Sequence, residues 1–283
     1  MTTPVTNPRA PVILAMSALA LTVLVLTALV TVVLSYGPEQ PEAAPEPEAV
    51  LIGVNAVSEP FTSSVLSTAV LLSEPAQAKA AELRQQLPVS PRRGVRPASG
   101  RQPGLYGVGA VAPCDVVALA NDLDANPGTA TPWGLALGLT PEQLPFYLNT
   151  LTPVVLLNDS WVTLHTPSGP EQAVLAAGTA VLVDALGVPR THCASGSPLS
   201  PPVDADLGGY RLTGTTWDYF ARTEVVVVKY AAEDHAGPVT EFTLLNIDDG
   251  QQVTRPVGRS IDLGGETKPL PDPAVMNIAF QPR

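Results

Sequence analysis

The sequence predicts an α+β fold behind an N-terminal transmembrane helix, and three observations lead to this prediction. Residues 12–34 are an unbroken apolar segment. Residues 114–148 carry apolar side chains at helical spacing between proline and glycine stops. From residue 153 onward, short β-branched runs alternate with turn residues, which is typical of antiparallel strands and hairpins. Because helices and strands occupy separate stretches, the pattern indicates α+β rather than alternating α/β.

The 12–34 segment is long enough to cross a membrane. Its 23 residues include no charged residue, proline or glycine. At about 1.5 Å per residue, a helix of this length spans roughly 34 Å, whereas the hydrocarbon core of a bilayer is about 30 Å thick. We therefore expect a retained signal anchor that contacts membrane lipid. Its hydroxyl groups can donate back to helical carbonyls; they belong to Ser17, Thr22, Thr27 and Thr31.

The charges on either side of this segment predict its orientation. Arg9 precedes it, the first Lys or Arg after it is Lys79, and several glutamates follow it closely. The positive-inside rule then places residues 1–11 in the cytoplasm and the rest outside the plasma membrane. A cleaved signal peptide is the alternative, but its apolar core would be about 7–15 residues long. Only a poor cleavage site follows, near Ala43 and Ala44.

The composition excludes some partners and predicts two linkers. The net charge of −11 and the pI near 4.6 argue against a nucleic-acid partner, which would favour a basic surface. Residues 35–49 are rich in proline and glutamate and predict a semi-stiff stalk. Residues 88–104 are a basic Pro/Gly linker, interpreted as a solvated tether, with contact to an anionic lipid or wall polymer as the alternative.

Residues 50–87, between the stalk and the linker, contain three expected elements. Residues 50–57 are a short apolar run that predicts a strand. Residues 64–72 are expected to form one or two helical turns. Residues 76–87 consist of good helix formers and end before Pro88.

The compact α+β ectodomain is expected over residues 105–263, and its first part is a lobe of short helices. The first helix follows Cys114 and ends at the Asn126-Pro127-Gly128 stop. The second is expected to begin at Thr131 as N-cap with Pro132 in its first turn, and Thr140-Pro141 repeats this signal for a helix over 142–148.

The second part of the ectodomain is expected to be mainly strands. An Asp249-Gly250 turn between two apolar runs is a strong hairpin signal. Residues 264–283 are expected to be a C-terminal tail. The expected elements are two strands within 153–166 that bend at Asn158-Asp159, a short helix over 170–177, a strand at 179–184 with its return at 188–193, a strand at 224–230, and a hairpin of 241–247 with 251–256.

Cys114 and Cys193 are the two cysteines of the chain. In an oxidising compartment an isolated pair most simply forms one disulfide. In the chain-entropy model, closing a loop of about 80 residues stabilises the fold by roughly 4.5 kcal/mol. The alternatives are two free buried thiols or one reactive thiol.

Several pieces of the sequence together resemble an uncharacterised extracytoplasmic domain family of actinobacteria, which has no assigned activity. The resemblance implies a domain carried outside a single membrane anchor, and it supplies no reaction. The pieces follow the family's order over residues 60–257, and the long one at 177–202 is the most specific. They are PFTSSV (60–65), QPGLYG (102–107), CD (114–115), LTPVVL (151–156), VTLH (162–165), AGTAVLVDALGVPRTHCASGSPLSPP (177–202), and VVVV with the hairpin after it (225–257).

The chain departs from this family at one place. The family usually has Cys-x-Cys-Gly-Asn-Pro-Leu, whereas this chain has Cys193-Ala194-Ser195-Gly196-Ser197-Pro198-Leu199. Ser195 stands where the second cysteine would be. The resemblance therefore implies one partner for Cys114 and no two-cysteine metal or redox motif.

The histidines and carboxylates give only weak candidates for chemistry. His165 and Asp184, with His192, could form a polar or metal site in space, but no HExxH motif or helical His spacing supports it. His192 is adjacent to Cys193, and neighbours on a strand point to opposite faces, so it is not expected to activate that thiol. Ser195-Gly196-Ser197 lacks the GxSxG motif. We therefore expect no catalytic residue, no metal and no cofactor, and histidines with structural roles.

An aromatic cluster is the best candidate for binding. Trp217, Tyr219 and Phe220 lie in a polar connection rather than in a periodic run. Aromatic rings of this kind can stack on sugar rings of a cell wall, and packing at the core or sheet edge is the alternative.

These observations predict a single-pass membrane-anchored extracytoplasmic protein of the bacterial cell envelope. We expect it to be non-catalytic and to bind a partner protein or a cell-wall component. One alternative is an envelope hydrolase or metalloenzyme that uses His165 and Asp184. Another is an accessory subunit of a membrane protein complex, since small residues in the anchor permit close helix packing.

Overall fold

The computed structural model divides into two compact units, residues 1–45 and 46–283. In the first unit, residues 23–28 and 30–31 are helical, and the Thr27 and Thr31 hydroxyls each donate to the carbonyl four residues earlier at 2.9 Å. The other residues of the expected anchor lie outside the described part of the chain. Among the described residues, no helix combines the length and the apolar character that a membrane crossing requires. The structure describes residues 23–28, 30–31, 46–54, 56–57, 59–90, 95–203, 206–229, 238–264 and 268–272.

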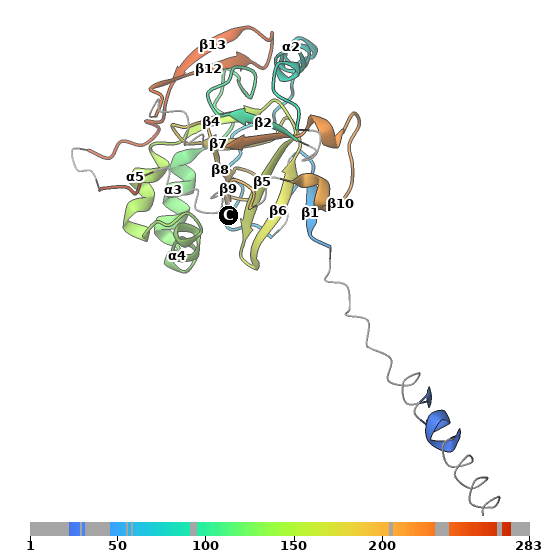
Figure 1. Cartoon of the computed structure of the whole chain (residues 1–283). Helices are drawn as coiled ribbons and strands as arrows, with labels where there is room; N and C mark the ends of the chain where they lie inside the picture. Colours follow the sequence, from blue (N-terminus) through green and yellow to red (C-terminus); the bar gives the residue numbers. More distant parts are fainter. Residues whose placement is uncertain are drawn as a thin grey trace, which may run out of the picture. The chain divides into compact units, whose positions relative to one another are not determined.

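The second unit has a mixed α+β architecture, as expected from the sequence. It combines a many-stranded sheet with short helices (Figure 1). The helices are α2 (Glu74–Gln85), α3 (Val116–Ala125), α4 (Pro127–Ala136) and α5 (Leu144–Leu148), with single 3₁₀ turns η1 (Pro141–Gln143), η2 (Leu207–Gly209) and η3 (Arg222–Glu224). The strands are β1 (Glu48–Ile52), β2 (Arg96–Ser99), β3 (Tyr106–Val108), β4 (Thr152–Leu156), β5 (Ser160–Thr166), β6 (Gly169–Leu175), β7 (Ala180–Val183), β8 (Pro189–His192), β9 (Ser197–Ser200), β10 (Arg211–Gly214), β11 (Val226–Lys229), β12 (Glu241–Asn246) and β13 (Gln252–Pro256).

All described strands except β2 and β11 follow one continuous path. Its order is β10-β1-β6-β5-β9-β8-β7-β4-β3-β12-β13. Strand β11 pairs with β2 along its length and contacts β5 at Val226 and Ser160. The sheet is mixed rather than antiparallel, which corrects part of the expectation. The parallel pairs are β1 with β10, β1 with β6, β2 with β11, β5 with β11, and β3 with β12.

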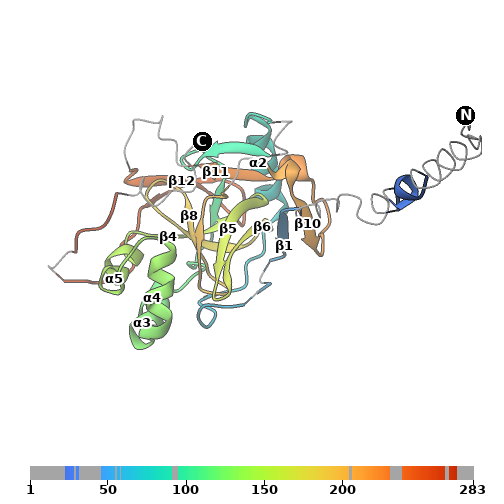
Figure 2. The ribbon, with the colours of Figure 1, turned by 60° about the horizontal axis from the view of Figure 1, so that its bottom comes forward.

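The lobe of short helices is formed by α3, α4 and α5, which lie together beside the sheet in both views (Figures 1 and 2). The Asp115 side chain caps α3 by accepting from the backbone N–H of Ala118 at 2.9 Å. Helix α4 begins at Pro127, directly after α3, because proline suits a first helical position. Thr131 is therefore not an N-cap as expected. It lies inside α4, where its hydroxyl donates to the Pro127 carbonyl at 3.1 Å.

Three segments differ from the sequence-based expectation. Residues 170–177 do not form a helix, because β6 pairs with β5 along its whole length. Residues 64–72 form no helical turn, and Leu66 instead makes a β-bridge to Cys114. The expected linker 88–104 is partly folded, since β2 lies within it and pairs with β11. In all three places, backbone pairing with another segment of the chain outweighs the local signal.

The core lies on both faces of strand β7. Val181 and Val183 pack into the main cluster with side chains from β4, β5, β6 and β11. Ala180 and Leu182 pack into a second cluster with the helices α3–α5. Successive side chains of a strand point to opposite faces, so an unbroken apolar run is what a strand buried on both sides requires.

Candidate functional site

A disulfide joins the helical lobe to the sheet. Cys114 precedes the N-cap of α3, and Cys193 follows β8. Their Cα atoms lie 5.9 Å apart, within the usual range for such a bond. Both cysteines of the chain are used in it. The expected disulfide is therefore present, and the alternatives of free or reactive thiols do not apply in this structure.

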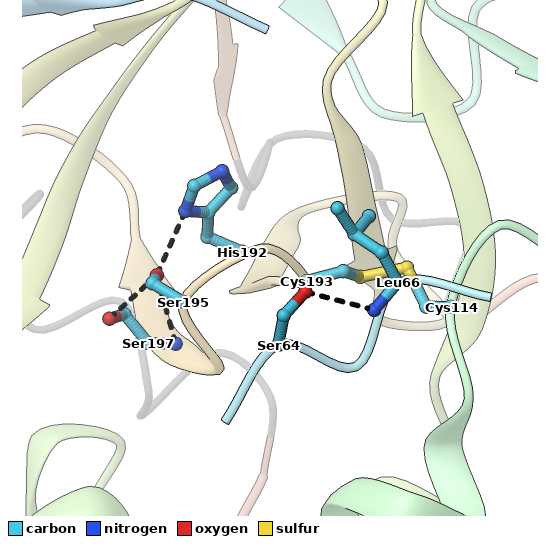
Figure 3. Close-up of a disulfide and its surroundings, with 7 residues drawn as sticks. All are labelled: Ser64, Leu66, Cys114, His192, Cys193, Ser195 and Ser197. Atoms are coloured by element: carbon cyan, nitrogen blue, oxygen red, sulfur yellow. Dashed lines mark hydrogen bonds between the residues drawn. A yellow bond between two sulfur atoms is a disulfide. The ribbon is translucent and has the colours of Figure 1, made fainter. Parts of the chain in front are cut away.

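A histidine and two serines lie beside this disulfide (Figure 3). His192 Nδ1 and Ser195 Oγ are 2.9 Å apart, and Ser195 Oγ donates to Ser197 Oγ at 2.8 Å. Burial lowers the pKa of His192 to about 4. The pair has the residue types of a nucleophile and its base, but both residues are at most 1% exposed. A substrate has no access to Ser195 Oγ here, so the cluster supports the 193–197 turn rather than chemistry at the surface.

The sequence-predicted polar site is not assembled. His165 lies on β5 and Asp184 follows β7, and strands β9 and β8 run between them. His165 Nε2 lies 2.9 Å from Ser200 Oγ, and burial lowers the pKa of His165. Asp184 makes a separate set of contacts. Among the described residues, no three His, Cys, Asp or Glu side chains gather as a metal would require.

Asp184 forms a buried ion pair with Arg190. Arg190 Nε donates to Asp184 Oδ2 at 2.8 Å, and the two side chains are 0% and 5% exposed. Asp184 Oδ1 accepts from the backbone N–H groups of Leu186 and Val188, each at 2.9 Å. The carboxylate is thus fully engaged in closing the β7–β8 turn. Burial, followed by the charge of Asp184, raises the pKa of the neighbouring Tyr106 phenol.

The aromatic cluster forms a turn that is anchored at both ends. The backbone N–H of Phe220 donates to the Trp217 carbonyl at 3.2 Å, which closes a four-residue turn. The two rings meet edge to face with centroids 5.2 Å apart. Both side chains are half-buried against the cluster that contains Trp161, Val225 and Val227. The interpretation of Trp217 and Phe220 as packing residues therefore fits this structure.

Tyr219 lies at the corner of that turn and differs from its two neighbours. Its side chain is 102% exposed, so it is in full contact with solvent. Its φ is 66°, in the left-handed region, which costs an ordinary residue roughly 1–2 kcal/mol. A large aromatic side chain therefore occupies a position where glycine or asparagine would be less strained. We refer to residues 217–220 as the Tyr219 turn.

Asp159 holds the Tyr219 turn to the body of the domain. Its Oδ2 accepts from Trp217 Nε1 at 3.2 Å, and its Oδ1 accepts from the backbone N–H of Ala177 at 2.9 Å. Burial raises the pKa of Asp159, although these two hydrogen bonds oppose the shift. The sequence indicated a bend at Asn158-Asp159, but no signal in it linked Asp159 to Trp217, which lies 58 residues away.

Two arginines and a glutamate fix the base of the same region. Arg84 Nε and Arg96 Nη2 donate to the two oxygens of Glu224, both at 2.8 Å. Partial burial alone would raise the pKa of Glu224, but the hydrogen bonds and charges of Arg96 and Arg84 bring it below its ordinary value. Arg96 belongs to the basic segment that was expected to be a tether. In the structure it is 9% exposed and joins β2 to η3.

The helical lobe carries a groove of about 200 Å³. It is lined mainly by alanine, leucine and proline from α3, α4, η1 and α5, with Asp124 and Glu142 as its charged members. None of the sequence-predicted site residues lies in it. Tyr219 remains the candidate for contact with a ligand.

Comparison with known proteins gives one result. Residues 96–258 match the family model described as "Domain of unknown function (DUF6777)". No curated protein and no solved structure matches the chain.

Proposed function

We propose that this chain, which belongs to the DUF6777 family of domains of unknown function, is a binding protein of the bacterial cell envelope. In this proposal the Tyr219 turn contacts a cell-wall component or a partner protein. The domain does so without catalysing a reaction on it.

The exposure of Tyr219 on a strained, anchored turn carries this proposal. A fully exposed tyrosine gains nothing from burial, and its left-handed backbone costs free energy. Strain of this kind is found at ligand-binding sites more often than elsewhere, where the surrounding structure maintains it. Here Trp217 and Phe220 maintain it by packing and Asp159 by a hydrogen bond. The neighbouring Thr215, Thr216 and Asp218 are also exposed and can supply hydrogen bonds to a polar ligand.

The burial of the polar clusters favours binding over hydrolysis. A hydrolase or metalloenzyme would need His165 and Asp184 in one accessible site. His165 instead contacts Ser200, and Asp184 is saturated by Arg190 and two backbone N–H groups. The His192–Ser195 pair has suitable chemistry, but no path from solvent reaches it.

Two features support an extracytoplasmic location as part of this proposal. Residues 12–34 have the length and composition of a signal anchor, and the charges beside them favour a cytoplasmic amino terminus. The disulfide between Cys114 and Cys193 suits an oxidising compartment, since such bonds are rare where thiols are kept reduced.

A sedimentation assay tests the binding role. The full-length chain in mild detergent is mixed with insoluble peptidoglycan, and the fraction that sediments is measured against peptidoglycan concentration. A tyrosine that carries much of the binding energy costs about 2 kcal/mol or more when it is truncated, so we expect Tyr219→Ala to bind at least about tenfold more weakly.

The matched control is Leu135→Ala, which removes another large side chain from the surface, 75% exposed on α4. It should bind as the unchanged chain does. If Tyr219→Ala and Leu135→Ala sediment alike, the Tyr219 turn is not the wall contact. If the unchanged chain does not sediment at all, peptidoglycan is not its ligand.

A further inference from the structure

A second groove lies between the β12–β13 hairpin and the end of β3, at the opposite end of the strand path from β10. Figure 1 labels the two strands of this hairpin. Its volume is about 200 Å³. The charged residues that line it are Arg255 on β13 and Asp248 in the hairpin turn. The remaining lining residues are Val108, Gly109, Ala110, Asn246, Val253 and Thr254.

Arg255 is half-buried on β13, and no carboxylate among the described residues forms an ion pair with it. Arg84 and Arg96 pair with Glu224, and Arg190 pairs with Asp184. Arg255 donates one long hydrogen bond of 3.4 Å to the Gly109 carbonyl. In the described part of the chain, it forms no ion pair. A guanidinium carries five N–H donors, so most of its donors are available to a ligand in the groove.

Asp248 supplies the opposite charge on the same groove. Its backbone N–H donates to Asn246 Oδ1 at 2.9 Å, which fixes the start of the hairpin turn. Within the described ranges, the Asp248 carboxylate enters no ion pair either. Its neighbour Asp249 has a structural role instead, because its carboxylate accepts from the backbone N–H of Gln251 at 2.9 Å.

We propose that this groove binds a small zwitterion of the α-amino acid class. The ligand carboxylate would accept paired hydrogen bonds from Arg255, a geometry that guanidinium groups favour. The ligand ammonium would contact Asp248. Opposite charges that line one groove without pairing with each other match a ligand that carries both charges. The volume lies below the range of about 300–1,000 Å³ that is typical of drug-sized ligands, so the groove suits a single amino acid.

This site is independent of the Tyr219 turn. The groove and the Tyr219 turn share no residue. The groove lies at the β12–β13 hairpin, whereas the Tyr219 turn follows β10, which is at the other end of the strand path. Failure of either proposal therefore leaves the other unaffected.

Saturation-transfer NMR on the full-length chain in detergent micelles tests the proposal with three small probes: alanine, acetate and methylammonium. We expect alanine to bind and both single-charge probes to bind at least tenfold more weakly. Arg255→Gln and Asp248→Asn should each weaken alanine binding about tenfold or more, because each removes the partner of one ligand charge.

Matched controls use the same exchanges at positions outside the groove. Arg211→Gln on β10 and Asp122→Asn on α3 should leave alanine binding unchanged within about twofold. The proposal is overturned if alanine does not bind, if acetate binds as well as alanine, or if the control variants lose binding as strongly as the groove variants do.

Discussion

Asp184 and Arg190 form an ion pair that water does not reach, and its loss would leave a charge in the core. The two side chains are 5% and 0% exposed, and the carboxylate also orders the β7–β8 turn. A buried pair of this kind contributes little net stability over an apolar pair, but removing one partner is costly. The Arg211–Glu48 pair is the contrast, since both of its side chains are exposed to solvent.

We expect Asp184→Asn to lower the free energy of unfolding by about 3–5 kcal/mol, because the Arg190 charge loses its counter-charge inside the protein. Urea unfolding of the two chains measures the difference. Arg211→Gln is the control and should change stability by less than about 1 kcal/mol. Similar effects of the two substitutions would contradict the assignment of Asp184–Arg190 as a buried pair that needs both partners.

His192 predicts a loss of stability in mild acid. Burial lowers its pKa from 6.5 to about 4, so between these pH values the unfolded chain binds a proton that the folded chain does not. The contribution of neutral His192 is complete above pH 6.5 and is lost as the pH falls toward 4. At about 1.4 kcal/mol per pKa unit, the loss over this window is about 3 kcal/mol.

Urea unfolding at several pH values between 7 and 4 checks this prediction, with His192→Gln as the comparison. The difference between the two chains should shrink as the pH falls, because only the histidine titrates. Parallel pH profiles would show that His192 is not the group responsible.

At the scale of elements, local patterns predict some parts of this fold and not others. Strands β7, β8 and β11 and the β12–β13 hairpin form where β-branched runs and turn residues predict them. Strand β6 does not, because proline, glutamate, glutamine and alanine in residues 170–173 favour a helical reading, and only the pairing with β5 makes them extended. Local patterns do not predict the parallel pairs either, because each of these pairs joins segments far apart in the chain.

The sequence likewise predicts only part of the candidate site. The sequence identifies Trp217, Tyr219 and Phe220 as one cluster, but not which ring is exposed. That depends on the tertiary contacts of Trp217 with Asp159 and of Phe220 with the core. No local sequence pattern predicts the ion pairs of Arg84 and Arg96 with Glu224 either, because the three residues lie on three different elements.

A glycine contact sets how closely β2 can approach the β7–β8 turn. A Cβ atom at Gly100 would overlap the Leu186 carbonyl oxygen and the Gly187 backbone, which are not free to move as a side chain is. Gly187 itself has a φ of 73°, so the facing backbone also requires glycine. The turn after β2 and the turn after β7 are thus packed backbone against backbone.

We therefore expect Gly100→Ala to destabilise the fold by about 1–3 kcal/mol or more, as overpacking does. Gly128→Ala on α4 is the control, because its Cβ would meet nothing within 4 Å. That substitution should leave stability unchanged or raise it by up to about 1 kcal/mol, since alanine favours helix. Thermal unfolding of the two variants decides the matter, and equal destabilisation would contradict the close contact at Gly100.

At the scale of the whole molecule, the folded unit is larger than the family match. The match covers residues 96–258, yet β1 lies inside the sheet between β10 and β6. Helix α2 also precedes the match, and its Arg84 donates to Glu224 within it. The segment before residue 96 therefore contributes to the same domain strand β1 and one of the two arginines that pair with Glu224.

Truncation tests this view. A chain that begins at residue 46 retains β1 and α2, and we expect it to unfold cooperatively in urea. A chain that begins at residue 88 leaves β6 and β10 without their shared partner, and we expect it to lose several kcal/mol of stability or to aggregate through the exposed edges. Equal stability of the two would mean that β1 and α2 are accessory to the fold.

We propose that this protein binds its partner at the cell surface through the Tyr219 turn. Site-specific photo-cross-linking in intact cells tests it most directly, with the photoreactive side chain at position 219 of the full chain and at position 135 as the exposed control. We predict abundant adducts to a wall polymer or a defined protein from position 219 and few from position 135. Equal adducts from both positions, or none from position 219, would contradict the account.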